Sequence, residues 1–263
     1  MMKIPRQALA VILVLLFCFF GCVSAPFKLD TLSTGSSVHK LNLVFVPLNY
    51  PDREDFLKDR EKLAQRLQKA APFNEFPDAV KFWDLAMDER QSRKFLIFQK
   101  ALPPVRVDAG FLKQIFKKIG ANYKLILVDN TGTVDCPELS SPEATSILIV
   151  GRRHFDQEPF LKSAFFHELG HSLGLRDESP KSYAQSCAPG YPNCAASKEE
   201  AAKWWGALLG KGATVRFFHG CCGRADHFRP TEASLMNDVY YASNFGPVNE
   251  AYLRKVLKGY RPS

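Results

Sequence analysis

Clusters of basic residues are scarce in this sequence, although its 263 residues carry a formal charge of +8. Pairs such as Lys117-Lys118 are typical, and aromatic residues do not alternate with basic ones as they do on nucleic-acid-binding surfaces. We therefore interpret the charge as a solvated surface and expect no nucleic-acid partner. No internal repeat is visible either, whereas hydrophobic residues make up 46% of the chain, which is enough for a buried core.

Long apolar runs are also missing, apart from one at Ala8–Phe20 near the N-terminus. A membrane-spanning helix needs about 20 apolar residues, and this run is shorter. Lys3 and Arg6 precede it and small residues follow it, which is the layout of a secretory signal. We therefore predict that residues 1–21 are a signal peptide and that the protein is exported.

Two cleavage points are open in this signal. Val23-Ser24-Ala25 fits the small-x-small rule for ordinary cleavage, but Pro26 would then be the first mature residue, which is a poor geometry for that step. Phe19-Phe20-Gly21-Cys22 resembles the bacterial lipobox, in which a small residue precedes a cysteine that becomes lipidated. We favour lipidation of Cys22, which predicts a bacterial membrane-anchored lipoprotein in the periplasm or at the cell surface. Soluble secretion is the alternative.

No two of the seven cysteines are separated by two residues, the spacing that cysteine-based zinc sites favour. Export instead places them where disulfides persist, and five lie beyond the N-terminal segment. Cys187 and Cys194 bracket the turn-rich segment APGYPN, so they are the pair that most easily closes a short loop. Cys136 is expected to reach Cys221 or Cys222, which leaves one thiol over.

The rest of the chain alternates between strand-like and helix-like segments. Residues 22–40 are rich in Ser, Thr and Gly beyond the lipobox and are expected to form a flexible tether. Apolar periodicity and the positions of Pro and Gly separate the elements that follow. We expect strands at residues 41–46, 94–98, 124–128 and 146–150, and helices at residues 51–71, 110–119 and 160–173. This order predicts an α/β fold with a mixed, twisted sheet covered by helices.

The character of the chain changes after Asp177. Short loops with Cys, Gly and Pro follow, together with helical stretches at residues 198–209 and 248–257. We therefore expect residues 41–263 to form one domain, with an upper subdomain at 41–176 and a smaller, loop-rich and helical subdomain at 177–263. A cleft between the two would be the natural place for a site.

The predicted helix at residues 160–173 carries two histidines four residues apart, His167 and His171. At 3.6 residues per turn this spacing directs both imidazoles to one point, where they can share a metal ion. Zinc suits such ligands, and the helix fixes two of them at little entropic cost. Glu168 lies beside the first histidine and is expected to be the general base that takes a proton from zinc-activated water.

A third ligand is expected just beyond this helix. Gly174 can adopt positive φ, end the helix and turn the chain back toward the metal, which brings Asp177 within reach. We predict that Asp177 is the third ligand of a single catalytic zinc ion, with Glu178 as the alternative. Three protein ligands leave one coordination position open, as in catalytic zinc sites.

These residues form the motif His167-Glu168-x-x-His171-x-x-Gly174-x-x-Asp177, which resembles the extended motif of the metzincin metallopeptidases, with Asp where most of them carry a third His. Ser234-Leu235-Met236-Asn237 is similar to their Met-turn, which places a methionine beneath the metal as an apolar floor. The resemblance implies an α+β, metzincin-like fold in which Met236 and its turn belong to the C-terminal subdomain.

Within that superfamily the sequence is most similar to the IgA-peptidase-type metallopeptidases. The similar segments are LNLVFVPLNY, PFNEF, KLILVDN, FFHELGHSLGLRDE, and FRPTEASLMND followed by FGPVNE. The chain departs from that family in the segment between His171 and the acidic pair, which is one residue shorter, and at Ser179, where a Tyr often follows that pair. The resemblance implies peptide-bond hydrolysis, whereas the departures argue against IgA as the substrate.

Together these features predict a zinc-dependent endopeptidase that acts on protein or peptide substrates and is held at a membrane by its lipid. Tyr240, Tyr241 and His227 are the candidates for a second donor to the developing oxyanion. An extended substrate could pair with the strand at residues 147–150. The alternative is a non-catalytic surface lipoprotein that uses this fold as a binding module. Glu168 favours the enzyme, because a non-catalytic zinc site needs no general base.

Overall fold

A computed structural model describes residues 28–31, 39–87, 90–92, 96–98, 105–120, 122–131, 136–140, 146–155, 157–180, 192–209 and 214–260. The predicted signal peptide, the predicted lipidation site Cys22 and most of the predicted tether lie outside these residues. Within them, no helix is both long enough and apolar enough to span a bilayer.

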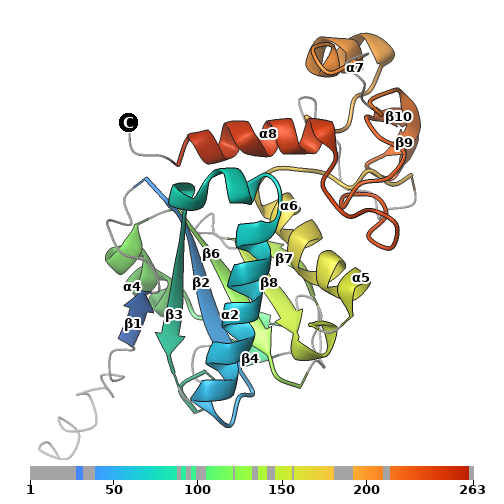
Figure 1. Ribbon diagram of the computed structural model, residues 1–263. Helices are drawn as coiled ribbons and strands as arrows, with labels where there is room; N and C mark the ends of the chain where they lie inside the picture. Colours follow the sequence, from blue (N-terminus) through green and yellow to red (C-terminus); the bar gives the residue numbers. More distant parts are fainter. Residues whose placement is uncertain are drawn as a thin grey trace, which may run out of the picture.

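A six-stranded sheet forms the centre of the molecule, in the order β1-β3-β2-β6-β8-β7 (Figure 1). Its strands are β1 (Lys28–Thr31), β2 (Leu41–Leu48), β3 (Val80–Ala86), β6 (Tyr123–Asp129), β7 (Cys136–Ser140) and β8 (Ser146–Gly151). β3, β2, β6 and β8 run parallel, and β1 and β7 are antiparallel strands at the two edges. The prediction of a mixed sheet covered by helices is therefore confirmed.

Helices cover both faces of this sheet. The α-helices are α2 (Arg53–Lys69), α4 (Ala109–Ile119), α5 (Glu158–Leu161), α6 (Glu168–Ser172), α7 (Lys198–Trp205) and α8 (Pro247–Lys258). All eight residues of β2 are buried, and their side chains alternate between two hydrophobic clusters. Leu43 and Phe45 belong to the cluster that contains α2, and Val44 and Val46 to the cluster that contains α4. Burial on both faces explains why these strands are continuous apolar runs in the sequence.

The remaining elements are short. They are the two-stranded sheets β4 (Leu96–Phe98) with β5 (Val105–Val107) and β9 (Phe218–Cys221) with β10 (Arg224–Arg229), and the 3-10 helices η1 (Phe73–Glu75), η2 (Pro77–Ala79) and η3 (Arg152–His154). β4 matches the part of the strand predicted at 94–98 that the structure describes. The sequence analysis missed β3, because the buried polar residues Lys81 and Asp84 interrupt its apolar pattern.

The helix that carries the histidine motif is continuous but not uniform. It begins as α5, passes through a π-helical segment, η4 (Lys162–His167), and ends as α6. The prediction of a helix at residues 160–173 is confirmed, and the π-helical segment ends at the first motif histidine. Single π turns of this kind occur mostly at functional sites, because the extra residue changes the direction of the side chains that follow it.

The segments after residue 177 contribute to the same hydrophobic core as the sheet. α8 lies across one end of the sheet (Figure 1), and its Leu253 and Leu257 are fully buried in the cluster that contains Phe45 and Phe165. Phe245 enters that cluster as well. A smaller cluster around Trp205 joins α7 to the start of α8. The two halves of the chain therefore share their main core.

Part of the predicted tether proves to be a strand. Residues 28–31 form β1 and pair with β3 in antiparallel register, from Lys28 opposite Ala86 to Thr31 opposite Trp83. Asp30 also accepts a hydrogen bond of 3.0 Å from Arg53. The tether prediction is wrong for these residues, because four residues are too few to show a strand pattern and their pairing partner lies about fifty residues further along the chain.

The shared core predicts that the protein unfolds as one unit. Phe245→Ala removes a fully buried ring from the main cluster and should lower the free energy of unfolding by about 3–5 kcal/mol. The loss should appear as one transition in urea, followed in parallel by circular dichroism and tryptophan fluorescence. Phe116→Ala is the control, since Phe116 is 52% exposed, and should change stability by less than about 0.5 kcal/mol. Two separate transitions would contradict the shared core.

Candidate metal centre

The two motif histidines meet at their Nε2 atoms, which lie 3.0 Å apart. The Nδ1 atom of His167 lies 2.7 Å from the carbonyl oxygen of Leu235, and that of His171 lies 3.0 Å from the carbonyl oxygen of Leu175. A carbonyl oxygen can only accept a hydrogen bond, so each Nδ1 carries a proton, and in the neutral imidazole each Nε2 then keeps a lone pair. This is the tautomer that a metal ligand needs, with the outer hydrogen bond that orients the ring.

Asp177 completes the group. Its Oδ1 atom lies 3.0 Å from Nε2 of His167 and 3.3 Å from Nε2 of His171. A tetrahedral ion with bonds of about 2.0–2.1 Å separates its ligand atoms by about 3.3 Å, so the three atoms have the spacing of one face of such a site. His167, His171 and Asp177 therefore fit a single divalent metal ion.

The electrostatics of this group also favour a cation. Burial opposes ionisation of Asp177, but its close contacts with His167 and His171 outweigh it and hold the pKa of the carboxyl well below its usual range. Burial likewise opposes protonation of His171, yet its contact with Asp177 raises the pKa of the imidazole, and the charge of Glu168 adds to the increase. An ionised carboxylate thus lies beside two imidazole nitrogens, where positive charge is stabilised.

The helix ends as the sequence predicted. Gly174 has a φ of +101°, and the Leu175 N–H donates to the carbonyl of Gly170 at 3.0 Å, as in a Schellman cap. A Cβ atom at Gly174 would lie 2.5 Å from the hydroxyl oxygen of Tyr252, so both the backbone and the packing require glycine. The reversal brings Asp177 back to the histidines.

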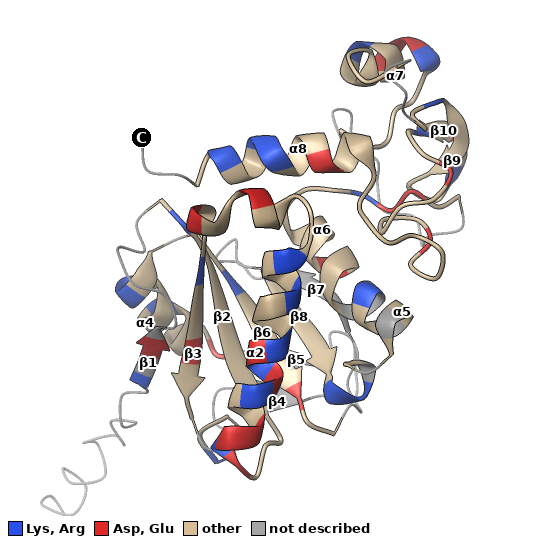
Figure 2. Cartoon of the chain, in the orientation of Figure 1, with Lys and Arg blue, Asp and Glu red and all other residues tan. Residues whose placement is uncertain are grey.

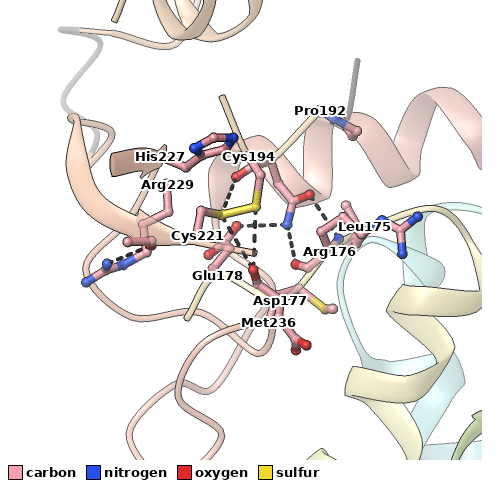
Figure 3. Close-up of a disulfide and its surroundings, with 12 residues drawn as sticks. Leu175, Arg176, Asp177, Glu178, Pro192, Cys194, Cys221, His227, Arg229 and Met236 are labelled. Atoms are coloured by element: carbon pink, nitrogen blue, oxygen red, sulfur yellow. Dashed lines mark hydrogen bonds between the residues drawn. A yellow bond between two sulfur atoms is a disulfide. The ribbon is translucent and has the colours of Figure 1, made fainter. Parts of the chain in front are cut away.

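The backbone of Asp177 is held by the cysteine-rich segment. The N–H of Cys222 donates to the carbonyl of Asp177 at 2.8 Å, and the Cys194–Cys221 disulfide lies against the same carbonyl (Figure 3). The expected Cys187–Cys194 pair is therefore wrong, and Cys221 is not available to Cys136. Nearness in sequence did not decide the pairing, because β9 brings Cys221 beside Asp177, which follows the helix that carries His167 and His171 (the motif helix).

Cys222 also takes part in a disulfide. Cys187 and the side chain of Cys136 lie outside the described residues. The Cys194–Cys221 disulfide has a sequence separation of 27 residues and closes the loop that contains α7. It therefore holds both ends of that loop beside Asp177.

Glu178, the alternative third ligand, points away from the histidines into the protein. It is fully buried, and its carboxylate accepts hydrogen bonds from Ser234 at 2.6 Å, Asn249 at 2.8 Å and Asn193 at 3.2 Å. Its N–H donates to the carbonyl of Met236 at 2.7 Å. Burial raises the pKa of Glu178 to about 7, although these hydrogen bonds oppose the increase. Glu178 thus links four segments and does not join the metal group.

Met236 lies in a tight turn against the motif helix. The N–H groups of Asn237 and Asp238 donate to the carbonyl of Ser234, and the Met236 side chain is fully buried. A Cβ atom at Gly170 would lie 2.6 Å from the Met236 sulfur, so the sulfur packs on the helix between the two histidines in sequence. The turn therefore packs on the helix surface beside Gly170, next to the second motif histidine in sequence.

The remaining predicted site residues are the general base Glu168 and the three candidate oxyanion donors. Glu168 begins α6 and is half-buried beside His167. Tyr240 and Tyr241 are 64% and 87% exposed, and buried His227 faces Asp226 at 3.1 Å. The N–H groups of Tyr240 and Tyr241 donate to the Asp238 carboxylate at 3.1 Å and 3.4 Å.

The sequence analysis assigned no role to several residues that hold the site. Leu235 and Leu175 act through backbone carbonyls, and Asn193 and Asn249 act through side chains far along the chain. No local pattern marks such residues. A scan against protein-family models found no match, and a search of curated proteins found none either. A functional assignment therefore has to be made from the residues of this chain.

The network around Glu178 predicts a sharp difference between two substitutions. Glu178→Ala leaves the donors of Ser234, Asn249 and Asn193 unpaired and should lower the free energy of unfolding by about 3 kcal/mol, whereas isosteric Glu178→Gln should cost about 1 kcal/mol. Urea denaturation of the metal-free proteins measures both values. Glu232→Ala, at an exposed position, is the matched control. Equal losses for Ala and Gln would contradict the bonding role of the carboxylate.

A second prediction concerns the end of the motif helix. Gly174→Ala should destabilise the fold through its positive φ and through contact with the Tyr252 hydroxyl. Adding Tyr252→Phe removes that hydroxyl and should restore the part of the unfolding free energy that the steric contact cost. The remaining loss, from the backbone conformation, should be about 1–2 kcal/mol. A double-mutant cycle in urea measures the coupling, with Tyr252→Phe alone as the control. Purely additive effects would show that the hydroxyl does not restrict this position.

Proposed function

We propose that this chain is a zinc-dependent endopeptidase, exported and anchored to a bacterial membrane by a lipid on Cys22. The observation that carries the proposal is the convergence of His167 Nε2, His171 Nε2 and Asp177 Oδ1, with both imidazole protons fixed on the opposite nitrogens by backbone carbonyls. Such an arrangement supplies lone pairs to one point and leaves no proton there to replace them.

Zinc is the metal that this ligand set favours. Two neutral imidazoles and one carboxylate, at the spacing of a tetrahedral face, match the three-ligand sets of catalytic zinc sites, which keep a fourth position for water or substrate. All-oxygen sets would instead favour magnesium or calcium. Glu168 adjoins the first ligand in sequence and stays outside the set of three, as a general base requires.

In the proposed reaction this chain positions the ligands and moves one proton. When bound, zinc lowers the pKa of a coordinated water and polarises the substrate carbonyl. The Glu168 carboxylate takes the water proton as the oxygen attacks the carbonyl carbon, and then delivers this proton to the leaving amine nitrogen. The Nδ1–H groups of His167 and His171 remain bonded to their carbonyls, which keeps Nε2 directed at the centre.

The strand expected to pair with a peptide substrate, β8, is not at the edge of the described sheet. β8, which contains residues 147–150, is bonded to β6 on one side and to β7 on the other. β7 is the edge of the described sheet and contacts α6. An extended substrate would therefore add to β7, since an edge strand offers unpaired backbone groups.

The proposal is tested with the full-length chain purified in detergent. Wild type and Glu168→Gln should each bind one zinc ion, measured by elemental analysis, but only wild type should cleave a mixed peptide library. Loss of the general base should slow cleavage about 10²–10⁴-fold. His171→Ala should lose the metal, and Glu199→Gln, at an exposed position on α7, should match wild type in both assays.

The other outcomes separate the alternatives. If wild type and Glu168→Gln both bind zinc and neither cleaves any peptide, the chain is a binding module built on this fold. If wild type purifies without zinc and does not take it up, the metal assignment is wrong. Cleavage that survives in Glu168→Gln would remove the proposed role of this carboxylate.

A further inference from the structure

A cavity of about 280 Å³ lies beside the metal centre. Its walls come from the last turn of α2, from the π-helical segment η4 and from the chain on either side of Ala242. The residues that decide its chemistry are Lys69, Lys162, Phe166, Leu235, Ser243 and Asn244. Apart from Leu235, whose carbonyl orients His167, none of these is among the residues that the proposed reaction uses.

One residue joins this cavity to the metal ligands. Leu235 lines the cavity, and its carbonyl is the acceptor that orients His167 at 2.7 Å. The N–H of Leu235 donates to the carbonyl of Asn244, another lining residue, at 2.9 Å. A molecule in the cavity would thus contact the residue whose carbonyl orients His167, from the Nδ1 side of its ring.

All charged residues that line the cavity are basic. They are Lys69, Lys162 and Arg66, and none of the nine lining residues is Asp or Glu. Arg66 and Lys69 occupy the last turn of α2, where cations also suit the helix dipole. That explanation does not extend to Lys162, which lies in η4. Figure 2 shows basic residues in blue both on α2 and on the helix that begins as α5. Two helices therefore bring like charges to one space, and an anion there would relieve their repulsion.

The rest of the lining is apolar. Phe166 and Leu235 are 6% and 4% exposed, and Ala70 and Ala71 lie beside them. The volume of about 280 Å³ is at the lower limit for pockets that enclose a whole small-molecule ligand. An occupant that fits both features is small, with a methylene stem for the apolar wall and a negative end for the lysines.

We propose that this cavity binds a carboxylate of the peptide substrate, so that the enzyme selects substrates with an acidic group at the position that reaches the cavity. This inference rests on the proposed function and adds the substrate class. Two sources offer the same chemistry, namely a Glu or Asp side chain and a free C-terminal carboxylate. The apolar wall favours Glu, whose stem is longer.

The test uses the full-length Glu168→Gln variant loaded with zinc, so that binding is measured without turnover. Positional sets of C-amidated octapeptides carry Glu or Gln at one fixed position, and a third set carries Gln with a free C-terminus. At one position Glu should bind about fivefold more tightly than Gln, measured by fluorescence anisotropy at low salt. Adding Lys162→Glu or Lys69→Glu should abolish or invert that preference.

Lys203→Glu on α7 is the control, because it makes the same change of charge at an exposed residue away from the cavity lining and should keep the preference. Zinc content and circular dichroism establish that each variant is folded, and Lys162→Gln replaces Lys162→Glu if the latter is not. A preference restricted to free C-termini would identify the terminal carboxylate as the source.

The result separates this inference from the proposed function. If wild type cleaves peptides but no set prefers an acidic group, the cavity proposal is overturned while the peptidase stands. If the Glu preference is present and depends on Lys162 but wild type cleaves nothing, the cavity binds carboxylates and the peptidase assignment fails. A preference that persists in Lys162→Glu and in Lys69→Glu would also overturn the cavity proposal.

Discussion

The buried carboxylate of Glu178 is the constraint on which the geometry of the candidate metal centre depends. It binds Ser234 in the turn that precedes Met236, Asn249 in α8 and Asn193 beside the disulfide. Its own N–H is bonded to the carbonyl of Met236. Because Asp177 is the adjacent residue, these bonds fix the chain on one side of the third ligand, while the Cys222 N–H fixes its carbonyl. The ligand therefore has little freedom to leave the histidines.

This arrangement is costly in stability. Burial raises the pKa of Glu178 to about 7, so the folded protein has to desolvate a carboxylate that water would ionise freely. An apolar side chain of similar volume would often pack at such a position with equal or better stability. It could not, however, bind three polar groups from separate segments. The buried carboxylate thus lowers stability, but its hydrogen bonds fix the positions of Asp177, the Met236 turn and α8 relative to one another. A metal site requires ligands in fixed positions.

How much the sequence predicts depends on whether the cause is local. Apolar periodicity identified α2, α4, β6 and β8, and the four-residue spacing identified His167 and His171, because each pattern is complete within one segment. β3 was missed because the buried polar residues Lys81 and Asp84 interrupt its pattern, and the partner of Asp84, Arg60, lies in α2. The disulfide was mispaired for the same reason, since β9 decides which cysteine reaches Cys194. Asp177 and Glu178 differ by one position, and only the fold shows which one faces the histidines.

The site therefore joins the two halves of the chain. The helix that packs on the sheet supplies the histidines, whereas the segments that hold Asp177 and Met236 pack with α8 and the disulfide. The carbonyl that orients His167 also comes from this second half, through Leu235. A metal ion bound by all three ligands would have high affinity only when both halves are docked. Its binding energy then becomes folding energy, about 4 kcal/mol at a free metal concentration 1,000 times its Kd.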